Sequence, residues 1–545
     1  MKLRHIIIAA LLVTIGPRAM AQQAAGDTVL KGSTIEVIQS YKPVVKKAPK
    51  PEWMPQLPPA DTTRPSLSFE VPQQTLYYSY TSGQLRPLAL GKDSLKIPFP
   101  NYIKAGAGNL STLFLDAGLG NIKGKNYSTG IHLHHLSQTG SIKGQQTASS
   151  GLEAEGLYYG KEKLWHAAVA AERNQNFFYG YNHDQFNYTT DSVKQTYTGV
   201  KIALDMKSKF MLKDNDIFYH PEINASLYDA RYNTSETHLG FSAPFNYWFD
   251  SSLEAQVTLS AFLTHLKLDG NTISNNLGEL KPGVILHQGK ITGHGFIGFA
   301  LGKDGKTSVL PDLLANYVVP GTPLTLSGGW EASIRKNTYE QLTTENPFLF
   351  NNYLVKQSRR DELFANVTGN YKSHLTYTIR ASWWNFTNLA TYINLAPDYK
   401  QFIVAYDDVS AFSLRGAVRY TESSKWSAGV STEFYSFYQG SLPHVWHEPT
   451  FRFRGDVAVK PIEKLTIMGY ASVLAGMNAM NVMSPSGNAI VLNPNIDLGV
   501  GAEYQLVSRL SAFAQGNNLL NSKYERWLGY EAYGLNVYGG VRLKF

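Results

Sequence analysis

Three histidines close together in the sequence raise metal binding as a first hypothesis. His132 and His134 are two residues apart, so in a β-strand both side chains lie on one face and both can reach one ion. His135 follows them directly. Histidines with this spacing are more often ordinary polar side chains of a strand, so the sequence predicts neither a metal site nor a bound cofactor.

Catalytic motifs do not emerge from the sequence either. It has no G-x-S-x-G element and no H-E-x-x-H element, which are the signatures of a nucleophile turn and of a zinc protease. His444 and His447 lie near Glu448, but no nucleophile can be assigned beside them. The sequence therefore predicts that the protein is not an enzyme.

The carboxy-terminal residues indicate the kind of element that carries these side chains. From Tyr533 to Phe545, one face is apolar and the other carries Asn536, Arg542 and Lys544. An alternating strand that ends on a terminal aromatic residue is typical of the closing strand of a barrel set in lipid. We expect this strand to close the barrel and to contact the outer-membrane assembly machinery through Val537, Val541, Leu543 and Phe545.

The composition favours a membrane barrel over a soluble protein. Charged residues make up 17% of the 545 residues, aromatic residues reach 12%, and 33 residues are Tyr. Few charges and many aromatic side chains suit a sheet with a lipid-facing band and interfacial girdles. The net charge of +8 includes Lys2, Arg4 and Arg18 of a leader and is too small to indicate nucleic-acid binding. The absence of cysteine excludes disulfides and lipoprotein acylation.

Residues 1–21 have the pattern of a signal peptide. Lys2 and Arg4 precede an apolar stretch from Ile6 to Ile15, and Ala19-Met20-Ala21 provides a small-residue cleavage site. No later stretch has eighteen consecutive apolar residues, so no transmembrane helix is expected. An exported, strand-rich chain of this kind is expected in the outer membrane of a bacterium with two membranes.

Residues 22–98 are expected to form a mostly irregular periplasmic segment. Eleven prolines between Pro43 and Pro100 disfavour helices and central strands and favour extended conformations. The segment is a tether, or it enters the barrel lumen, or Thr34-Ile35-Glu36-Val37-Ile38 adds as a strand to a periplasmic or energy-coupling protein. The sequence leaves these three alternatives open.

From residue 99 to residue 545, alternating runs are separated by polar gaps that are short and long in turn. This rhythm predicts an all-β fold, an antiparallel transmembrane barrel of about 22 strands with tight periplasmic turns and long outer loops. In 164–172, for example, Trp165 and Val169 are expected to face lipid while His166 and Glu172 face inward. Charged side chains on the lipid face are costly, so this sorting fixes the register.

Two sets of side chains are candidate ligand contacts. The first is a basic lumen wall that attracts anionic solutes, or else a set of solvated side chains paired with Asp456, Asp497 and Glu503. It consists of Arg415, Arg419, Arg452, Arg454, Arg542 and Lys544. The second is an aromatic outer loop that stacks on flat ligands or sugars, or else packs and anchors the loop. It consists of Phe177, Phe178, Tyr179, Tyr181, Phe186 and Tyr188.

The late strands resemble those of TonB-dependent receptors. The residues that carry the resemblance are Pro449-Thr-Phe-Arg-Phe-Arg-Gly-Asp456, the run from Ile496 to Gly516, and Asn517-Asn-Leu-Leu-Asn-Ser-Lys-Tyr524. The resemblance implies a 22-stranded barrel that imports solutes with energy from the inner membrane. This chain departs from the family's pattern in residues 22–98, which are too short and too proline-rich to form the family's usual plug domain.

Two functions follow from these expectations. The first is an outer-membrane transport barrel for the uptake or passage of a solute, related to TonB-dependent receptors but without a recognisable plug. The alternative is a structural or assembly accessory barrel that docks partner envelope proteins. Without a plug, a barrel of this size needs another block, which is the 22–98 segment, infolded loops or a partner. Outer-membrane lipid is the expected environment in both cases.

Overall fold

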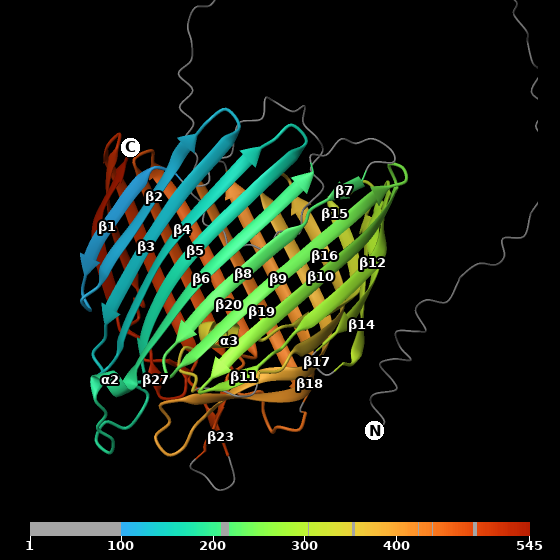
Figure 1. The fold of residues 1–545 in the computed structure, drawn as a ribbon. Coiled ribbons are helices and arrows are strands. Elements are labelled where there is room, and N and C mark those ends of the chain that lie inside the picture. The colour runs from blue at the N-terminus through green and yellow to red at the C-terminus, as the bar shows by residue number, and fades with distance from the viewer. Residues whose placement is uncertain are drawn as a thin grey trace, which may run out of the picture. The chain divides into compact units, whose positions relative to one another are not determined.

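The computed structural model describes residues 100–545 except for 209–216, 303–304, 351–354, 423–424, 439 and 483–487. The predicted signal peptide, the proline-rich segment and the partner strand Thr34–Ile38 lie outside the described residues. Within the described residues the fold is all-β, a closed antiparallel barrel of 22 strands (Figure 1). The predicted number of strands is confirmed.

The strands of the barrel follow the order of the chain. They are β1 (Tyr102–Gly108), β2 (Leu113–Lys123), β3 (Tyr127–Thr139), β4 (Gln146–Tyr159), β5 (Lys163–Phe177), β6 (Lys194–Ser208), β8 (Glu222–Ala230), β9 (Thr234–Trp248), β10 (Leu253–Leu268), β12 (Leu277–Gln288), β13 (Ile291–Leu301), β14 (Thr307–Val318), β15 (Leu324–Arg335), β16 (Ser358–Tyr371), β17 (Leu375–Asn394), β18 (Phe402–Glu422), β19 (Trp426–Tyr438), β20 (Phe451–Ile462), β21 (Leu465–Ala475), β24 (Asn495–Val507), β25 (Leu510–Asn517) and β28 (Asn536–Lys544).

Two further short strands belong to the barrel sheet in addition to the 22 strands of the ring. β7 (Ile217–Tyr219) pairs with β9 ahead of β8, and β11 (Asn271–Ile273) pairs with β10 ahead of β12. Two small hairpins lie outside the barrel sheet, β22 (Asn478–Met480) with β23 (Ala489–Val491) and β26 (Glu525–Trp527) with β27 (Tyr530–Glu531). The described helices, α2 (Thr190–Val193) and α3 (Tyr339–Glu345), are short, and neither is long and apolar enough to cross a membrane.

The barrel closes where the two ends of the described chain meet. β1 pairs antiparallel with β28, so that Tyr102 lies opposite Lys544 and Gly108 lies opposite Tyr538. Every other strand of the ring pairs with the next strand along the chain. The carboxy-terminal strand therefore closes the barrel, and no sheet edge remains unpaired in the ring.

The alternation of side chains matches the register expected for a lipid-facing wall. On β28, Val537, Val541 and Leu543 are about half exposed, whereas Asn536 and Tyr538 point inward and are buried. On β5, Trp165 and Val169 are exposed, while the inward His166 hydrogen-bonds to Asp205. Apolar side chains exposed outside a polar lumen are the arrangement that a bilayer stabilises.

The two ends of the barrel differ in their connections. β4 and β5, β9 and β10, and β12 and β13 are joined by turns of a few residues, and both β1 and β28 have their chain-terminal ends on this side. The long loops, α2, α3, β23 and β27 gather at the other end, which is the lower end in Figure 1. In outer-membrane barrels the short turns face the periplasm and the long loops face outward, so we call the long loops of this barrel the outer loops.

β17 and β18 are the longest strands and continue beyond the wall of the barrel. After a register shift between Phe386 and Leu389, residues Leu389–Asn394 pair with Phe402–Asp407. This extension bends across the loop end, where β18 runs nearly crosswise in Figure 1. The sequence predicted residues 387–408 to be a polar outer loop; instead the hairpin stays regular because its apolar side chains are buried by neighbouring loops.

Candidate functional site in the lumen and the outer closure

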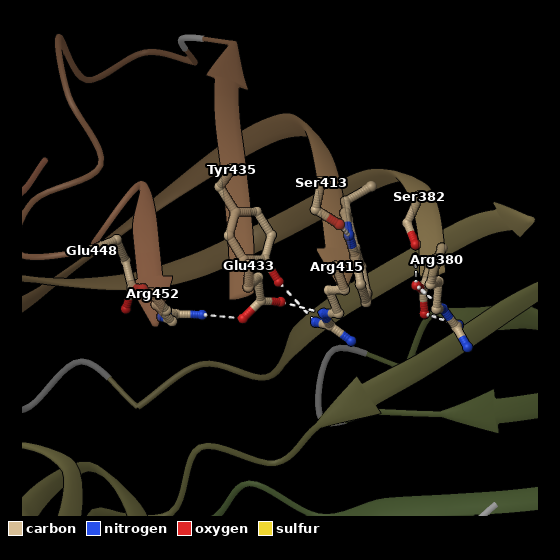
Figure 2. Close-up of polar contacts among 10 residues, drawn as sticks. Arg380, Ser382, Ser413, Arg415, Glu433, Tyr435, Glu448 and Arg452 are labelled. Atoms are coloured by element: carbon tan, nitrogen blue, oxygen red, sulfur yellow. Dashed lines mark hydrogen bonds and ion pairs between the residues drawn. The ribbon is translucent and has the colours of Figure 1, made fainter. Parts of the chain in front are cut away.

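Charged side chains form a row of pairs on the inner wall of the barrel (Figure 2). Arg415 on β18 pairs with Glu433 on β19 and donates a 2.9 Å hydrogen bond to the Tyr435 hydroxyl. Arg452 on β20 lies 3.3 Å from the other oxygen of Glu433 and 2.8 Å from Glu448. Arg415, Glu433 and Arg452 are side by side in the strand register, so the row runs round the wall.

The row continues on β16 and β17. Arg380 donates two hydrogen bonds to Glu362, of 2.9 and 2.6 Å, and the Ser382 hydroxyl donates a third of 2.6 Å. Glu362 is only 5% exposed, so its charge depends on these donors. The guanidinium of Arg380 also lies 3.5 Å from the ring centre of Phe364. The whole arrangement holds each arginine in one orientation.

These contacts show where the six side chains of the predicted basic wall lie. Arg415 and Arg452 share Glu433, Arg419 pairs with Asp456 at 3.0 Å, and Arg542 pairs with Glu503 at 3.4 Å. Paired guanidinium groups attract anions less than an unpaired wall does. Arg454 and Lys544 are exposed. A role of this set in ligand binding stays a prediction.

Other strands of the wall carry histidines in paired positions, on β3, β5 and β13. His132 lies 3.1 Å from Asp116, His166 lies 2.6 Å from Asp205, and His294 lies 2.8 Å from Asp312. Each histidine is thus a polar lumen side chain that hydrogen-bonds to a neighbouring strand. Within the described residues, no group of three or more His, Asp or Glu side chains could hold a metal ion.

α3 enters the lumen and is held by the wall of the barrel. Glu236 on β9 is buried and accepts hydrogen bonds from the backbone N–H groups of Tyr339 (3.0 Å) and Glu340 (2.9 Å) at the start of the helix. Lys201 lies 2.9 Å from Glu340. A carboxylate at a helix N-terminus satisfies donors that the helix itself cannot.

A local sequence signal marks the start of this helix, although the helix was not predicted from the sequence. Thr338 caps it by accepting a 3.1 Å hydrogen bond from the N–H of Gln341. Thr followed three residues later by Gln is the spacing of a capping box. Glu236 gives no comparable signal, because its role depends on a contact with a residue 103 positions away.

The outer loops share one apolar core at the end of the barrel. Leu342 and Leu349 from the loop after β15, Tyr392 and Phe402 from the β17–β18 hairpin, and Tyr530 are all buried. The ring of Phe348 stacks on Tyr530 at a centroid distance of 3.6 Å. Since these side chains come from three separate loops, the loops form a single packed layer, which we call the loop core.

Contacts of the loop core cross the mouth of the barrel. The loop after β5 and the β17–β18 hairpin arise on nearly opposite sides of the ring. Tyr188 of the first donates a 2.6 Å hydrogen bond to Asp398 of the second, and Lys400 also pairs with Asp398. The ammonium of Lys400 lies 4.3 Å from the ring centre of Tyr188. We call these three side chains the cross-mouth latch.

The predicted aromatic contact loop contributes to this closure. Phe177 and Phe178 are buried with Val193, and Tyr179 packs in the loop core, where its hydroxyl donates a 2.8 Å hydrogen bond to the backbone oxygen of Glu531. Tyr181, Phe186 and Tyr188 are half-buried. Their packing accounts for their positions, and contact with a ligand stays a prediction.

His447 has a structural role in the packing of the outer loops. It is 1% exposed, its Nδ1 lies 2.8 Å from the backbone oxygen of Tyr392, and its ring packs against Phe402 and Trp527. Burial lowers the pKa of His447 to about 3, so the ring is neutral at physiological pH. Burial likewise raises the pKa of the neighbouring Glu448.

Comparison with solved structures identifies the class of barrel. The iron transporter FrpB from Neisseria meningitidis (F3-3 variant) superposes with a TM-score of 0.64 at 11% identity, covering 83% of this chain and 82% of that chain. The siderophore receptor PirA from Acinetobacter baumannii gives 0.63 at 8% identity, covering 83% and 81%. The pyoverdine outer membrane receptor FpvA from Pseudomonas aeruginosa PAO1 gives 0.62 at 12% identity, covering 83% and 79%.

The chain has the 22-stranded fold of the TonB-dependent receptors, as its late strands predicted. The copper transporter OprC has the same fold, with a TM-score of 0.59 at 10% identity, covering 83% of this chain and 80% of that chain. No protein-family model and no curated protein matches the sequence. The fold therefore gives the class, and the particular role must come from the lumen and the loop core.

Proposed function

We propose that this chain passes a small solute across the outer membrane through a lumen that its own outer loops close. The loop core carries this proposal, because buried side chains from opposite sides of the ring meet over the mouth. A receptor-like barrel needs a barrier, and the loops provide one on the outer side. The paired charges of the wall keep the lumen polar without an excess of one sign.

The proposal gives the β17–β18 hairpin the role of a gate. Phe386 and Val409 are paired at the point where the hairpin leaves the wall. Replacing residues 387–408 with Asn-Gly therefore leaves a two-residue turn between paired residues, which hairpins accept readily. The variant removes Asp398, Tyr392 and Phe402 while preserving the wall.

Conductance in planar lipid bilayers tests this role. The full chain is expected to conduct little, and the shortened variant is expected to conduct steadily. Equal conductance of the two proteins would refute gating by the hairpin. If conductance rises only when residues 22–98 are also deleted, the barrel transports but its barrier is that segment.

A sealed mouth is also the observation that favours the accessory function. In that case neither deletion opens a pore, and the intact protein co-purifies with assembly proteins of the envelope. The conductance experiment thus separates the two functions. An energy-coupling partner is tested by the same co-purification, with Thr34–Ile38 deleted as the comparison.

A further inference from the structure

A polar cavity of about 250 Å³ lies between α3 and the inner face of β4, β5, β6 and β8. One side consists of Glu172, Asn174 and Asn176, which are successive inward positions of β5. The other side consists of Glu340, Thr343 and neighbouring residues of α3. The cavity therefore lies between a fixed wall and the loop that carries Leu342 and Leu349 into the loop core.

The α3 side of the cavity is occupied by internal hydrogen bonds. The Tyr197 hydroxyl donates to the backbone oxygen of Pro347 at 2.9 Å, and the Tyr228 hydroxyl lies 2.7 Å from the Thr343 hydroxyl. Glu340 pairs with Lys201 and accepts a 2.9 Å hydrogen bond from Ser226. These groups fix the shape of the cavity.

The β5 side offers groups to a ligand. Asn174 accepts a hydrogen bond from the Ser149 hydroxyl at 2.7 Å, and Asn176 accepts one from the Thr147 hydroxyl at 3.2 Å. These bonds use the amide oxygens, so the Nδ2 groups of both asparagines can donate to a ligand. Glu172 places a carboxylate acceptor on the same face.

We propose that this cavity binds a neutral polyhydroxylated solute of about the size of a monosaccharide. Two amide donors and a carboxylate acceptor at alternate positions of one strand, about 7 Å apart, suit hydroxyl groups on different parts of one solute, because a hydroxyl both donates and accepts. The cavity has two carboxylates, Glu172 and Glu340, and one nearby cation, Lys201. This excess of negative charge disfavours an anionic solute. The small volume excludes larger ligands. The proposal rests on the proposed function, in which solutes enter the lumen.

The variants separate hydrogen bonding from folding. Asn174→Asp and Asn176→Asp keep an oxygen that accepts from Ser149 or Thr147, replace the amide donor with an acceptor and add a negative charge. Asn366→Asp is the matched control, because Asn366 lies on β16 away from the cavity and bonds to Thr368. Glu172→Gln removes the charge with little change of size. Heat-modifiable migration in gel electrophoresis checks that each variant is a folded barrel.

Calorimetric titration of the full chain in detergent with D-glucose and D-gluconate is the test. Glucose is expected to bind, gluconate is expected not to bind, and the double Asn variant is expected to weaken glucose binding at least tenfold while Asn366→Asp does not. Glu172→Gln is expected to admit gluconate. No binding of any probe, or equal loss in the control, would overturn the assignment, while conductance of the hairpin-deleted barrel reports on transport separately.

Discussion

Tyr188 and Asp398 are 210 residues apart in the sequence and joined by a 2.6 Å hydrogen bond over the mouth of the barrel. Lys400 completes the cross-mouth latch from the Asp398 side. The loop that carries Tyr188 and the hairpin that carries Asp398 arise on nearly opposite sides of the ring, so this bond spans the mouth. Variants of the latch therefore test whether the mouth of the barrel opens.

Because the chain has no cysteine, the latch can be controlled with a single introduced thiol pair. Tyr188→Cys with Asp398→Cys removes the hydrogen bond, and we expect measurable bilayer conductance from this variant. Linking the two thiols with a short bismaleimide is expected to return conductance to the level of the unmodified protein. Unchanged conductance before and after linking would show that the mouth does not open here.

Acid is expected to weaken the latch. Burial raises the pKa of Asp398, but hydrogen bonds from Lys400 and Tyr188 outweigh it and hold the pKa below the usual range. A lowered carboxyl pKa stabilises the closed state above the ordinary pKa of Asp and loses that effect as the pH falls through the lowered value. Conductance should therefore rise only in strongly acidic solution.

Asp398→Asn distinguishes this carboxylate from other groups that titrate in the loops. His447 becomes charged in the same acidic range, and it stays in the variant. We expect Asp398→Asn to conduct at neutral pH and to lose most of the acid response. A full acid response in the variant would assign the effect to another group.

The stability of α3 in its position against the barrel wall is expected to depend on Glu236. Glu236→Ala leaves two buried backbone N–H groups without their acceptor, so α3 should lose about 1–2 kcal/mol of local stability. Hydrogen exchange of residues 339–345 measures this loss. Glu236→Gln keeps one acceptor oxygen and should have a smaller effect. Equal exchange in all three proteins would mean that the loop core alone holds the helix.

The pair of Arg380 with the buried Glu362 is expected to matter more than exposed pairs. Glu362→Leu leaves the partly buried guanidinium of Arg380 with only Glu331, 3.6 Å away, as a carboxylate partner, and should lower the free energy of unfolding by about 1–3 kcal/mol. Adding Arg380→Leu should recover most of it. Lys523 is 74% exposed in its pair with Glu531, so Lys523→Ala should cost close to nothing. Reversible urea unfolding in lipid vesicles compares the variants.

The register of β5 can be tested with one charge on each face. Val169 is 46% exposed on the outside, whereas Ala168 faces the lumen. Val169→Arg should cost about 2–4 kcal/mol near mid-depth, and Ala168→Arg should cost much less. The same unfolding measurement applies. Equal costs would contradict the assignment of the outer face to lipid.

Much of the barrel could be predicted because its rules are local. The alternation that placed Trp165 outside and His166 inside needs only two neighbouring residues, and repetition gave about 22 strands. The closing role of the strand ending at Phe545 followed from the same rhythm. The resemblance of the late strands supplied the family of folds.

The outer closure could not be predicted for the opposite reason. Phe402 was expected in a long polar gap of the sequence, and it is buried by contacts with Trp527 and Tyr530 from a loop more than 100 residues away. The pairing of Arg415 with Glu433 was missed in the same way, since an inward basic side chain does not reveal its partner on the next strand. Contacts of this kind require the register of the whole ring.

The ring order also links the latch to the closure of the barrel. The latch joins segments whose strands lie nearly half a circumference apart, so its geometry depends on the diameter of the ring that the pairing of β1 with β28 completes. We therefore expect that a barrel whose β1–β28 seam has not formed also lacks the latch.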